Sequence, residues 1–245
     1  MSRRRDLPRA ERNSTRPVAI VTGAGRGIGR ATAEALADKG YALVIAELRP
    51  RLGRAAERSF ARSGCDALFV ETNVADPDSV ERCVGAAARR FGRIDCLVNN
   101  AGVLAVGPLV SLAVREIDRI LGVNLKGAIL MARAVLPAMT RQGEGVIVNV
   151  SSLFGKSGSG DYVTYCASKF GVVGFTEALA DEVAADGVKV WAVCPNMVDT
   201  AMARKTGLSA SVRHRALKPE AVASVIVALA TGSRRAASGT AVDIV

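Results

Sequence analysis

One tyrosine and one lysine in the stretch SSLFGKSGSGDYVTYCASKF, residues 151–170, have a spacing that could support proton transfer. Tyr165 stands four residues before Lys169, and on a helix this spacing places both side chains on one face. Lowering the pKa of a phenol by about three units requires roughly 4 kcal/mol, which an ammonium at about 4 Å can supply in a partly buried site. Ser152, thirteen residues before Tyr165, could bond the same substrate oxygen. We predict that Tyr165 exchanges a proton with a carbonyl or alcohol oxygen, although an exposed helical pair is the default interpretation of Y-x-x-x-K alone.

A glycine-rich loop follows the first apolar run of the chain. The segment TGAGRGIG, residues 22–29, places Gly23, Gly27 and Gly29 before and within the start of a helical pattern. Small residues let the backbone approach a pyrophosphate, and a helix N-terminus adds N–H donors and partial positive charge. Ile28 stands where G-x-G-x-x-G would need its last glycine, so a purely structural tight turn is an equal alternative for the loop taken alone. We predict that the phosphates of a dinucleotide bind here.

An acidic residue ends the second apolar run and bears on the choice of dinucleotide. Glu47 lies 24 residues after Gly23, where a carboxylate can accept hydrogen bonds from an adenosine ribose. The same charge at about 4 Å from a 2′-phosphate costs roughly 4 kcal/mol for each unit of charge at an effective dielectric constant near 20. We therefore predict NAD(H) as the favoured cofactor. NADP(H) stays possible because Arg26 and Arg49 could compensate the charge, although solvated surface arginines are the alternative interpretation.

Short apolar runs alternate with helical patterns along the chain, which predicts a repeated β-α order. We expect one α/β domain over residues 17–245, a Rossmann-type, doubly wound and mostly parallel seven-stranded sheet with helices on both faces. Ligands of such sheets lie beyond the carboxyl ends of the strands. The expected strands lie near residues 17–23, 41–47, 66–72, 94–102, 145–152, 188–195 and 239–245, and the expected helices near 27–39, before 62, and near 76–91, 111–140, 161–185 and 219–231.

Short motifs in the right order make the chain similar to a classical short-chain dehydrogenase/reductase. TGAGRGIG resembles the family's T-G-x-x-x-G-x-G, and NNAG at 99–102, VNLKG at 123–127, the serine pair at 151–152 and YCASK at 165–169 resemble its other motifs. The resemblance extends from about Pro17 to the C-terminus. It implies that Tyr165 is the general acid/base, that Ser152 orients and polarises the substrate oxygen, and that Lys169 lowers the tyrosine pKa and holds the nicotinamide ribose. It further implies that Asn124 holds a proton-relaying water; from the residues alone, Asn124 is a buried amide or a helix irregularity.

The resemblance also implies a set of cofactor contacts. Asn73 stands where the family has Asp, which still leaves an amide for the adenine, and Asn196 replaces the glycine that usually follows Pro195. Val198 and Thr200 are implied to contact the nicotinamide amide. The complete implied set is Gly23, Arg26, Gly27, Ile28 and Gly29 at the pyrophosphate loop, Glu47, Asn73 and Val74 at the adenosine, Asn100, Ala101 and Gly102 at the middle of the cofactor, and Tyr165, Lys169, Pro195, Val198 and Thr200 at the nicotinamide.

Apolar residues next to these motifs could line a substrate pocket, with core packing as the alternative. They are Leu104, Val106, Leu153, Phe154, Met197 and Met202, with Ser152 at the reacting oxygen and residues 203–218, including His214, as a lid. The predicted function is hydride transfer between a nicotinamide cofactor and a ketone or secondary alcohol. The chain is also similar to 3-oxoacyl-[acyl-carrier-protein] reductases, an alternative that would use NADPH. However, Gly143 and Asp186 stand where those enzymes tend to have basic docking residues. A non-catalytic NAD(P)-binding regulator is the alternative from another class.

Composition narrows the partners. The chain has 245 residues and a net charge of +10, of which residues 1–16 supply +4 as a predicted disordered basic arm. The basic residues are not interleaved with aromatic residues, so we expect no nucleic acid. Neither an export signal nor a membrane span is expected. Five separated cysteines and one histidine predict a reduced, cytoplasmic protein without a metal site. The family resemblance implies a homotetramer, or a homodimer.

Overall fold

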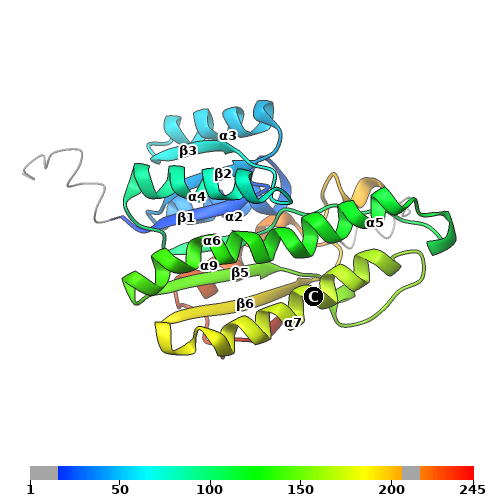
Figure 1. The fold of residues 1–245 in the computed structure, drawn as a ribbon. Coiled ribbons are helices and arrows are strands. Elements are labelled where there is room, and N and C mark those ends of the chain that lie inside the picture. Colours follow the sequence, from blue (N-terminus) through cyan, green and yellow to red (C-terminus); the bar gives the residue numbers. More distant parts are fainter. Residues whose placement is uncertain (1–15, 206–215) are drawn as a thin grey trace, which may run out of the picture.

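A single parallel sheet forms the centre of the molecule (Figure 1). The computed structural model describes residues 16–205 and 216–245, so the predicted arm before Arg16 and His214 of the predicted lid lie outside the described residues. The strand order is β3-β2-β1-β4-β5-β6-β7, and every neighbouring pair is parallel. The predicted fold class is therefore confirmed. The strands are β1 (Val18–Thr22), β2 (Ala42–Glu47), β3 (Ala67–Glu71), β4 (Cys96–Asn99), β5 (Gly145–Val150), β6 (Val188–Pro195) and β7 (Ala241–Ile244).

Helices cover both faces of the sheet and enclose two apolar cores. Met131 and Val84 are buried in the core under one group of helices, and Leu36 and Ile226 in the core under the other. Each such side chain contributes about 1.5–3 kcal/mol when it leaves water. One face carries α4 (Pro77–Phe91), α6 (Gly127–Gln142) and α7 (Val163–Glu182), and the other carries α2 (Gly27–Asp38), α3 (Pro50–Arg62) and α9 (Pro219–Ala230) (Figure 1).

The ends of α4 illustrate how the sequence delimits these helices. The carboxylate of Asp76 accepts a hydrogen bond from the backbone N–H of Asp78, and Pro77 occupies the first turn, where its missing N–H costs nothing. Gly92 ends the helix in the left-handed conformation with φ 78°, a conformation that glycine adopts without a Cβ penalty. The predicted boundaries near 76 and 91 follow directly from this capping chemistry.

The helical stretch predicted over 111–140 is interrupted in the structure. A 3-10 turn η1 (Leu109–Ser111) precedes α5 (Val114–Leu121), and a π turn η2 (Gly122–Lys126) then joins α5 to α6. The combined stretch Val114–Gln142 is long and apolar enough to cross a membrane by length and composition alone. The sequence did not predict this, because polar residues interrupt the apolar ones along the stretch. A core helix of a soluble protein passes the same test, and α6 here packs on β4 and β5.

Candidate active site

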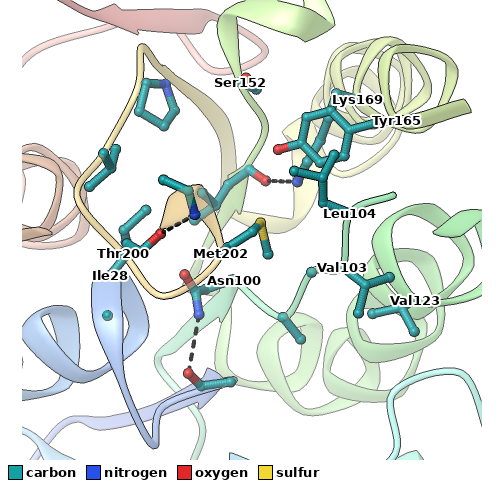
Figure 2. A pocket seen from close by; sticks show the side chains of 18 of the residues that line it. Ile28, Asn100, Val103, Leu104, Val123, Ser152, Tyr165, Lys169, Thr200 and Met202 are labelled. Atoms are coloured by element: carbon teal, nitrogen blue, oxygen red, sulfur yellow. Dashed lines mark hydrogen bonds between the residues drawn. The ribbon is translucent and has the colours of Figure 1, made fainter. Parts of the chain in front are cut away.

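A cleft of about 710 Å³ opens at the carboxyl ends of the strands. Ser152, Tyr165 and Lys169 line it together with most of the implied cofactor residues. Figure 2 shows Tyr165 and Lys169 side by side on one helix, across the cleft from Ile28 and Thr200. Three predicted residues, Gly29, Val106 and Asn124, do not line the cleft. The predicted residues that do line it are Gly23, Arg26, Gly27, Ile28, Glu47, Asn73, Val74, Asn100, Ala101, Gly102, Leu104, Ser152, Leu153, Phe154, Tyr165, Lys169, Pro195, Met197, Val198, Thr200 and Met202.

The glycine loop forms a cradle at the N-terminus of α2. Gly23 and Gly27 have positive φ angles of 66° and 57°, which favour glycine. A Cβ at Gly27 would lie 3.4 Å from the methyl carbon of Thr200 and would narrow the cleft. No side chain caps the start of α2 and its first turn holds no acidic residue, so its N–H groups and partial positive charge suit an anion. The loop therefore fits the pyrophosphate of a dinucleotide.

Asn100 connects the glycine loop to the end of β4. Its Nδ2 donates to the carbonyl oxygen of Thr22 at 2.8 Å, and its backbone N–H donates to Thr22 Oγ1 at 2.9 Å. A Cβ at Gly29 would collide with the Asn100 side chain and with the carbonyl oxygen of Gly23. Gly29 therefore supports the loop by permitting this close approach.

Glu47 is a buried carboxylate at the adenosine end of the cleft, with 3 % of its surface exposed. Its Oε2 accepts a hydrogen bond from Gly25 N at 3.1 Å, and its Oε1 accepts from Arg49 N and from Arg49 Nε, each at 3.1 Å. Since a carboxylate has about four acceptor sites, Oε2 retains one for a ligand. Asn73 is exposed nearby, and its Oδ1 accepts from Ala75 N at 3.1 Å.

The two hydroxyl residues of the predicted catalytic pair both line the cleft. Ser152 Oγ accepts a hydrogen bond from the backbone N–H of Phe154 at 3.2 Å. Burial raises the pKa of Tyr165 to about 12, and the Ser152 side chain lowers that pKa only in part. The predicted lowering of the phenol pKa by Lys169 is therefore not found in the protein alone.

Lys169 does not lower the pKa of Tyr165 in the way that its spacing suggested. Its Nζ donates to the carbonyl oxygen of Val150 at 2.7 Å and lies 5.6 Å from the centre of the Tyr165 ring (Figure 2). Burial lowers the pKa of this ammonium to about 8. Because charging a buried amine is costly, desolvation rather than mutual attraction dominates the titration of both groups.

Asn124 occupies the π turn between α5 and α6. Its Oδ1 accepts from Val103 N at 2.8 Å, and its Nδ2 donates to the carbonyl oxygen of Val103 at 3.0 Å and to Ser168 Oγ at 3.0 Å. Both descriptions available from the residues alone, a buried amide and a helix irregularity, are thus correct. A Cβ at Gly102 would lie 3.5 Å from Asn124 Oδ1 and 3.9 Å from Lys169 Nζ, so Asn124 and Lys169 flank the same glycine.

The loop after β6 closes the side of the cleft opposite Tyr165. Val198 forms an isolated parallel bridge with Leu217, and Asn196 N donates to the carbonyl oxygen of Ile244 at 2.9 Å. Asn196 does not have a positive φ angle, so replacing the usual glycine demands no strained backbone here. Among residues 16–205 and 216–245, no group of three or more His, Cys, Asp or Glu side chains could hold a metal ion.

The substrate end of the cleft is apolar. Phe154 lies here with the half-buried Met197 and Met202. Val106 was expected here, but it is exposed and does not line the cleft. From the sequence, Tyr162 is either a pocket or a surface residue, and the structure places it in the cleft. Val123, which directly precedes Asn124, also lines the cleft and was not predicted there.

The loop that carries Ser152 and Phe154 is attached to the last strand of the sheet. Lys156 Nζ lies 2.6 Å from Asp243 Oδ1 and donates to the carbonyl oxygen of Ala241 at 2.8 Å. Both acceptor residues belong to β7. We call these two contacts of Lys156 the β7 staple.

The chain is similar to several known proteins. The model of the short chain dehydrogenase family matches residues 17–210. The 3-oxoacyl-[acyl-carrier-protein] reductase FabG of Thermotoga maritima is 36 % identical over 93 % of this chain and 95 % of that protein. Cis-4-hydroxycyclohexanecarboxylate dehydrogenase of Sinomonas cyclohexanicum is 40 % identical over 87 % and 89 % of the two chains. The crystal structure of levodione reductase superposes with a TM-score of 0.86 and 30 % identity over 93 % of this chain and 95 % of that chain.

Proposed function

The chain belongs to the short-chain dehydrogenase family and is an NAD(P)-dependent oxidoreductase. We propose that it interconverts a ketone and a secondary alcohol, with Tyr165 as general acid/base. The observation that carries the proposal is the convergence of Ser152, Tyr165 and Lys169 on one cleft, with Lys169 Nζ 5.6 Å from the centre of the Tyr165 ring. A structural tyrosine would need neither partner.

The side chains divide the reaction as follows. Tyr165, with its raised pKa, carries its proton at neutral pH and can donate it from Oη to a carbonyl oxygen. Ser152 holds that oxygen beside Tyr165. Lys169 is the group whose pKa of about 8 allows it to exchange a proton near neutral pH, and Asn124 positions the backbone beside it. The nicotinamide, when bound, supplies or accepts the hydride.

We propose NAD(H) as the preferred cofactor. Glu47 is buried against the glycine loop and keeps one acceptor site on Oε2 for a ribose hydroxyl. A 2′-phosphate at the same position would meet this carboxylate in a poorly hydrated site. The ion pair with Arg49, 3.1 Å between Nε and Oε1, offsets part of that repulsion and allows slower use of NADPH.

Acyl-carrier reduction is the second candidate, and the similarity to 3-oxoacyl-[acyl-carrier-protein] reductases favours it. Against it, the acidic Asp186 would repel an acidic carrier protein if that protein docked there; its Oδ2 accepts from Thr140 Oγ1 at 3.2 Å. Gly143 also adds no positive charge. Turnover of an acetoacetyl-carrier substrate with NADPH, faster than that of every simple ketone with NADH, would reverse the order of the two candidates.

The test of the proposed function is Tyr165→Phe, which removes one oxygen atom. We expect the affinity for NADH to stay within about twofold while turnover of ketones and alcohols falls by about 10³-fold. Binding is measured by fluorescence titration of NADH, and turnover by NADH absorbance over a panel of ketones. Unchanged turnover would remove Tyr165 from the mechanism, and a wild-type protein that binds NADH without turning over any substrate would support the non-catalytic regulator.

We further propose a cytoplasmic homotetramer, or a homodimer. Exposed apolar side chains on α6 and α7, namely Ile129, Val163 and Phe170, favour association of subunits through these helices. Light scattering after size exclusion measures the mass directly. A monomer at micromolar concentration would exclude this proposal.

A further inference from the structure

Two aromatic side chains form one side of the substrate end of the cleft. The rings of Phe154 and Tyr162 lie 4.9 Å apart between centroids with their planes at 46°. Phe154 also contacts Tyr165 edge to face, with centroids 6.4 Å apart and planes at 83°. We call Phe154 and Tyr162 the aromatic wall. Since both residues line the cleft, a substrate whose oxygen reaches Tyr165 lies next to this wall.

The backbone holds the aromatic wall in place. Asp161, directly before Tyr162, has a φ of 60° and is the one non-glycine residue with a positive φ in the described part of the chain. Its carbonyl oxygen accepts a hydrogen bond from Gly107 N at 2.9 Å, and the carbonyl oxygen of Tyr162 accepts from Cys166 N at 2.8 Å. A left-handed aspartate costs free energy, which the surrounding contacts must offset. The hydrogen bonds to the carbonyl oxygens of Asp161 and Tyr162 therefore hold the backbone of Tyr162 before and at this residue.

Charge is distributed unequally along the cleft. Over residues 16–205 and 216–245, the charged side chains that line it are Arg26, Glu47 and Arg49 at the adenosine end and Lys169 beside Tyr165. Lys169 is already hydrogen-bonded to Val150. The cleft lining also includes apolar side chains such as Leu104 and Met202, and the hydroxyls of Ser152, Ser159, Tyr162 and Tyr165. Among the described lining residues, Lys169 is the one charged side chain that an ionised substituent here could meet, so such a substituent would lose much of its hydration for few new partners.

We propose that the aromatic wall selects an uncharged alicyclic ketone or secondary alcohol over an open-chain substrate with the same number of carbon atoms. This inference rests on the proposed ketone–alcohol activity. A ring is already rigid, so it buries its CH₂ groups against a fixed wall with little loss of conformational freedom, whereas an open chain must give up several rotatable bonds. In reduction, the carbonyl carbon gains a hydride from the cofactor and its oxygen gains the proton of Tyr165 while the C=O π bond breaks.

The first measurement compares cyclohexanone with 2-hexanone, which have six carbon atoms each, using the full chain and NADH. We expect kcat/KM to be about tenfold higher for cyclohexanone, the scale on which apolar pockets discriminate small differences in shape. Equal values, or a higher value for 2-hexanone, would overturn the selection of a ring while leaving the proposed function intact. Absence of turnover with both ketones and with the matching alcohols would instead refute the proposed function.

The second measurement locates the selectivity in the aromatic wall. Phe154→Ala and Tyr162→Ala should each lower kcat/KM for cyclohexanone about tenfold and that for 2-hexanone less than about threefold. Tyr162→Phe retains the ring and should keep the wild-type ratio between the two substrates. Equal losses for both substrates in a variant that still binds NADH would exclude the wall as the selecting element. If an alanine variant does not fold, Phe154→Leu and Tyr162→Leu remove the flat ring with less loss of volume and carry the same expectation.

Discussion

The two ends of the cleft each bury a charge, but they satisfy it differently. At the adenosine end, the Glu47 carboxylate accepts three hydrogen bonds from Gly25 and Arg49. At the catalytic end, the Lys169 ammonium has three protons to donate and makes one protein hydrogen bond, to Val150. The buried charge at the adenosine end thus has more protein partners than the buried charge at the catalytic end.

The adenosine end recognises a ligand, whereas the catalytic end reacts with one. The Glu47 carboxylate is held in place by its three hydrogen bonds. A buried amine with one partner titrates more easily, which agrees with the lowered pKa of Lys169, about 8. Four predictions test the contrast between the hydrogen-bonded carboxylate of the adenosine end and the titratable amine of the catalytic end.

The largest expected effect is on turnover. Lys169→Met removes the ammonium and keeps an unbranched side chain that is one atom shorter, and we expect kcat to fall by about 10²-fold or more because proton transfer loses its support. Steady-state assays with a ketone and NADH measure this loss. Lys126→Met, an exposed lysine of the π turn, is the matched control and should retain activity. Comparable losses in both variants would show that the effect is not specific to the titratable end.

Stability should depend on pH through the same amine. The pKa of Lys169 is lowered from 10.5 to about 8, a difference of about 3 kcal/mol in the free energy of charging. Between pH 8 and 10.5 the unfolded chain binds a proton that the folded chain has released, so the free energy of unfolding from this group rises with pH. Below pH 8 the full penalty is present in the folded state.

Urea unfolding at pH 7, 8, 9 and 10 tests this sign. Wild-type protein should gain stability relative to Lys169→Met as the pH rises from 8 to 10, while the raised pKa of Tyr165 acts in the opposite direction only above pH 10. Parallel curves for the two proteins would contradict a titrating buried amine.

A smaller effect is expected at the adenosine end. Glu47→Gln removes the buried charge, and the preference for NADH over NADPH should fall by about 10- to 100-fold, within the scale of one partly screened charge contact. The ratio of kcat/KM for the two cofactors measures it. Glu71→Gln is the control, since Glu71 is the exposed register partner of Glu47 on β3. Strong NADPH preference in the wild type would show that Glu47 does not decide the cofactor.

The smallest effect is expected from Arg49→Gln. Without the guanidinium, the charge of Glu47 is less neutralised, so KM for NADPH should rise about threefold while KM for NADH changes little. The effect is small because half-exposed ion pairs contribute less than about 1 kcal/mol. Arg51→Gln, an exposed arginine two residues along, serves as the control. A lower KM for NADPH in Arg49→Gln would show that Arg49 does not assist the 2′-phosphate.

Much of the architecture could be predicted because its signals are local. Apolar runs such as VAIVT and ALVIAE become fully buried strands, and the spacing of Tyr165 and Lys169 places both in the cleft. The family motifs brought Asn124 to notice, but neither its π turn nor its contacts with Val103 follow from helix propensity, since they arise when α5 and α6 pack beside another loop.

The electrostatics and the substrate end could not be predicted from the sequence. Spacing alone suggested that Lys169 lowers the pKa of Tyr165, but the extent of burial decides both pKa values, and burial is a property of the whole fold. Tyr162 enters the cleft because the loop at Gly107 fixes the backbone of Asp161. Because this hydrogen bond joins residues more than fifty positions apart, no local sequence pattern predicts it.

The β7 staple has a consequence for biosynthesis. The loop with Ser152 is synthesised before β7. Lys156 of this loop nevertheless contacts Asp243 and Ala241, which belong to β7. Chains emerge from the ribosome and fold from the N-terminal side. A nascent chain that already contains Ser152, Tyr165 and Lys169 therefore lacks these two contacts of its reactive loop until β7 has been made and paired.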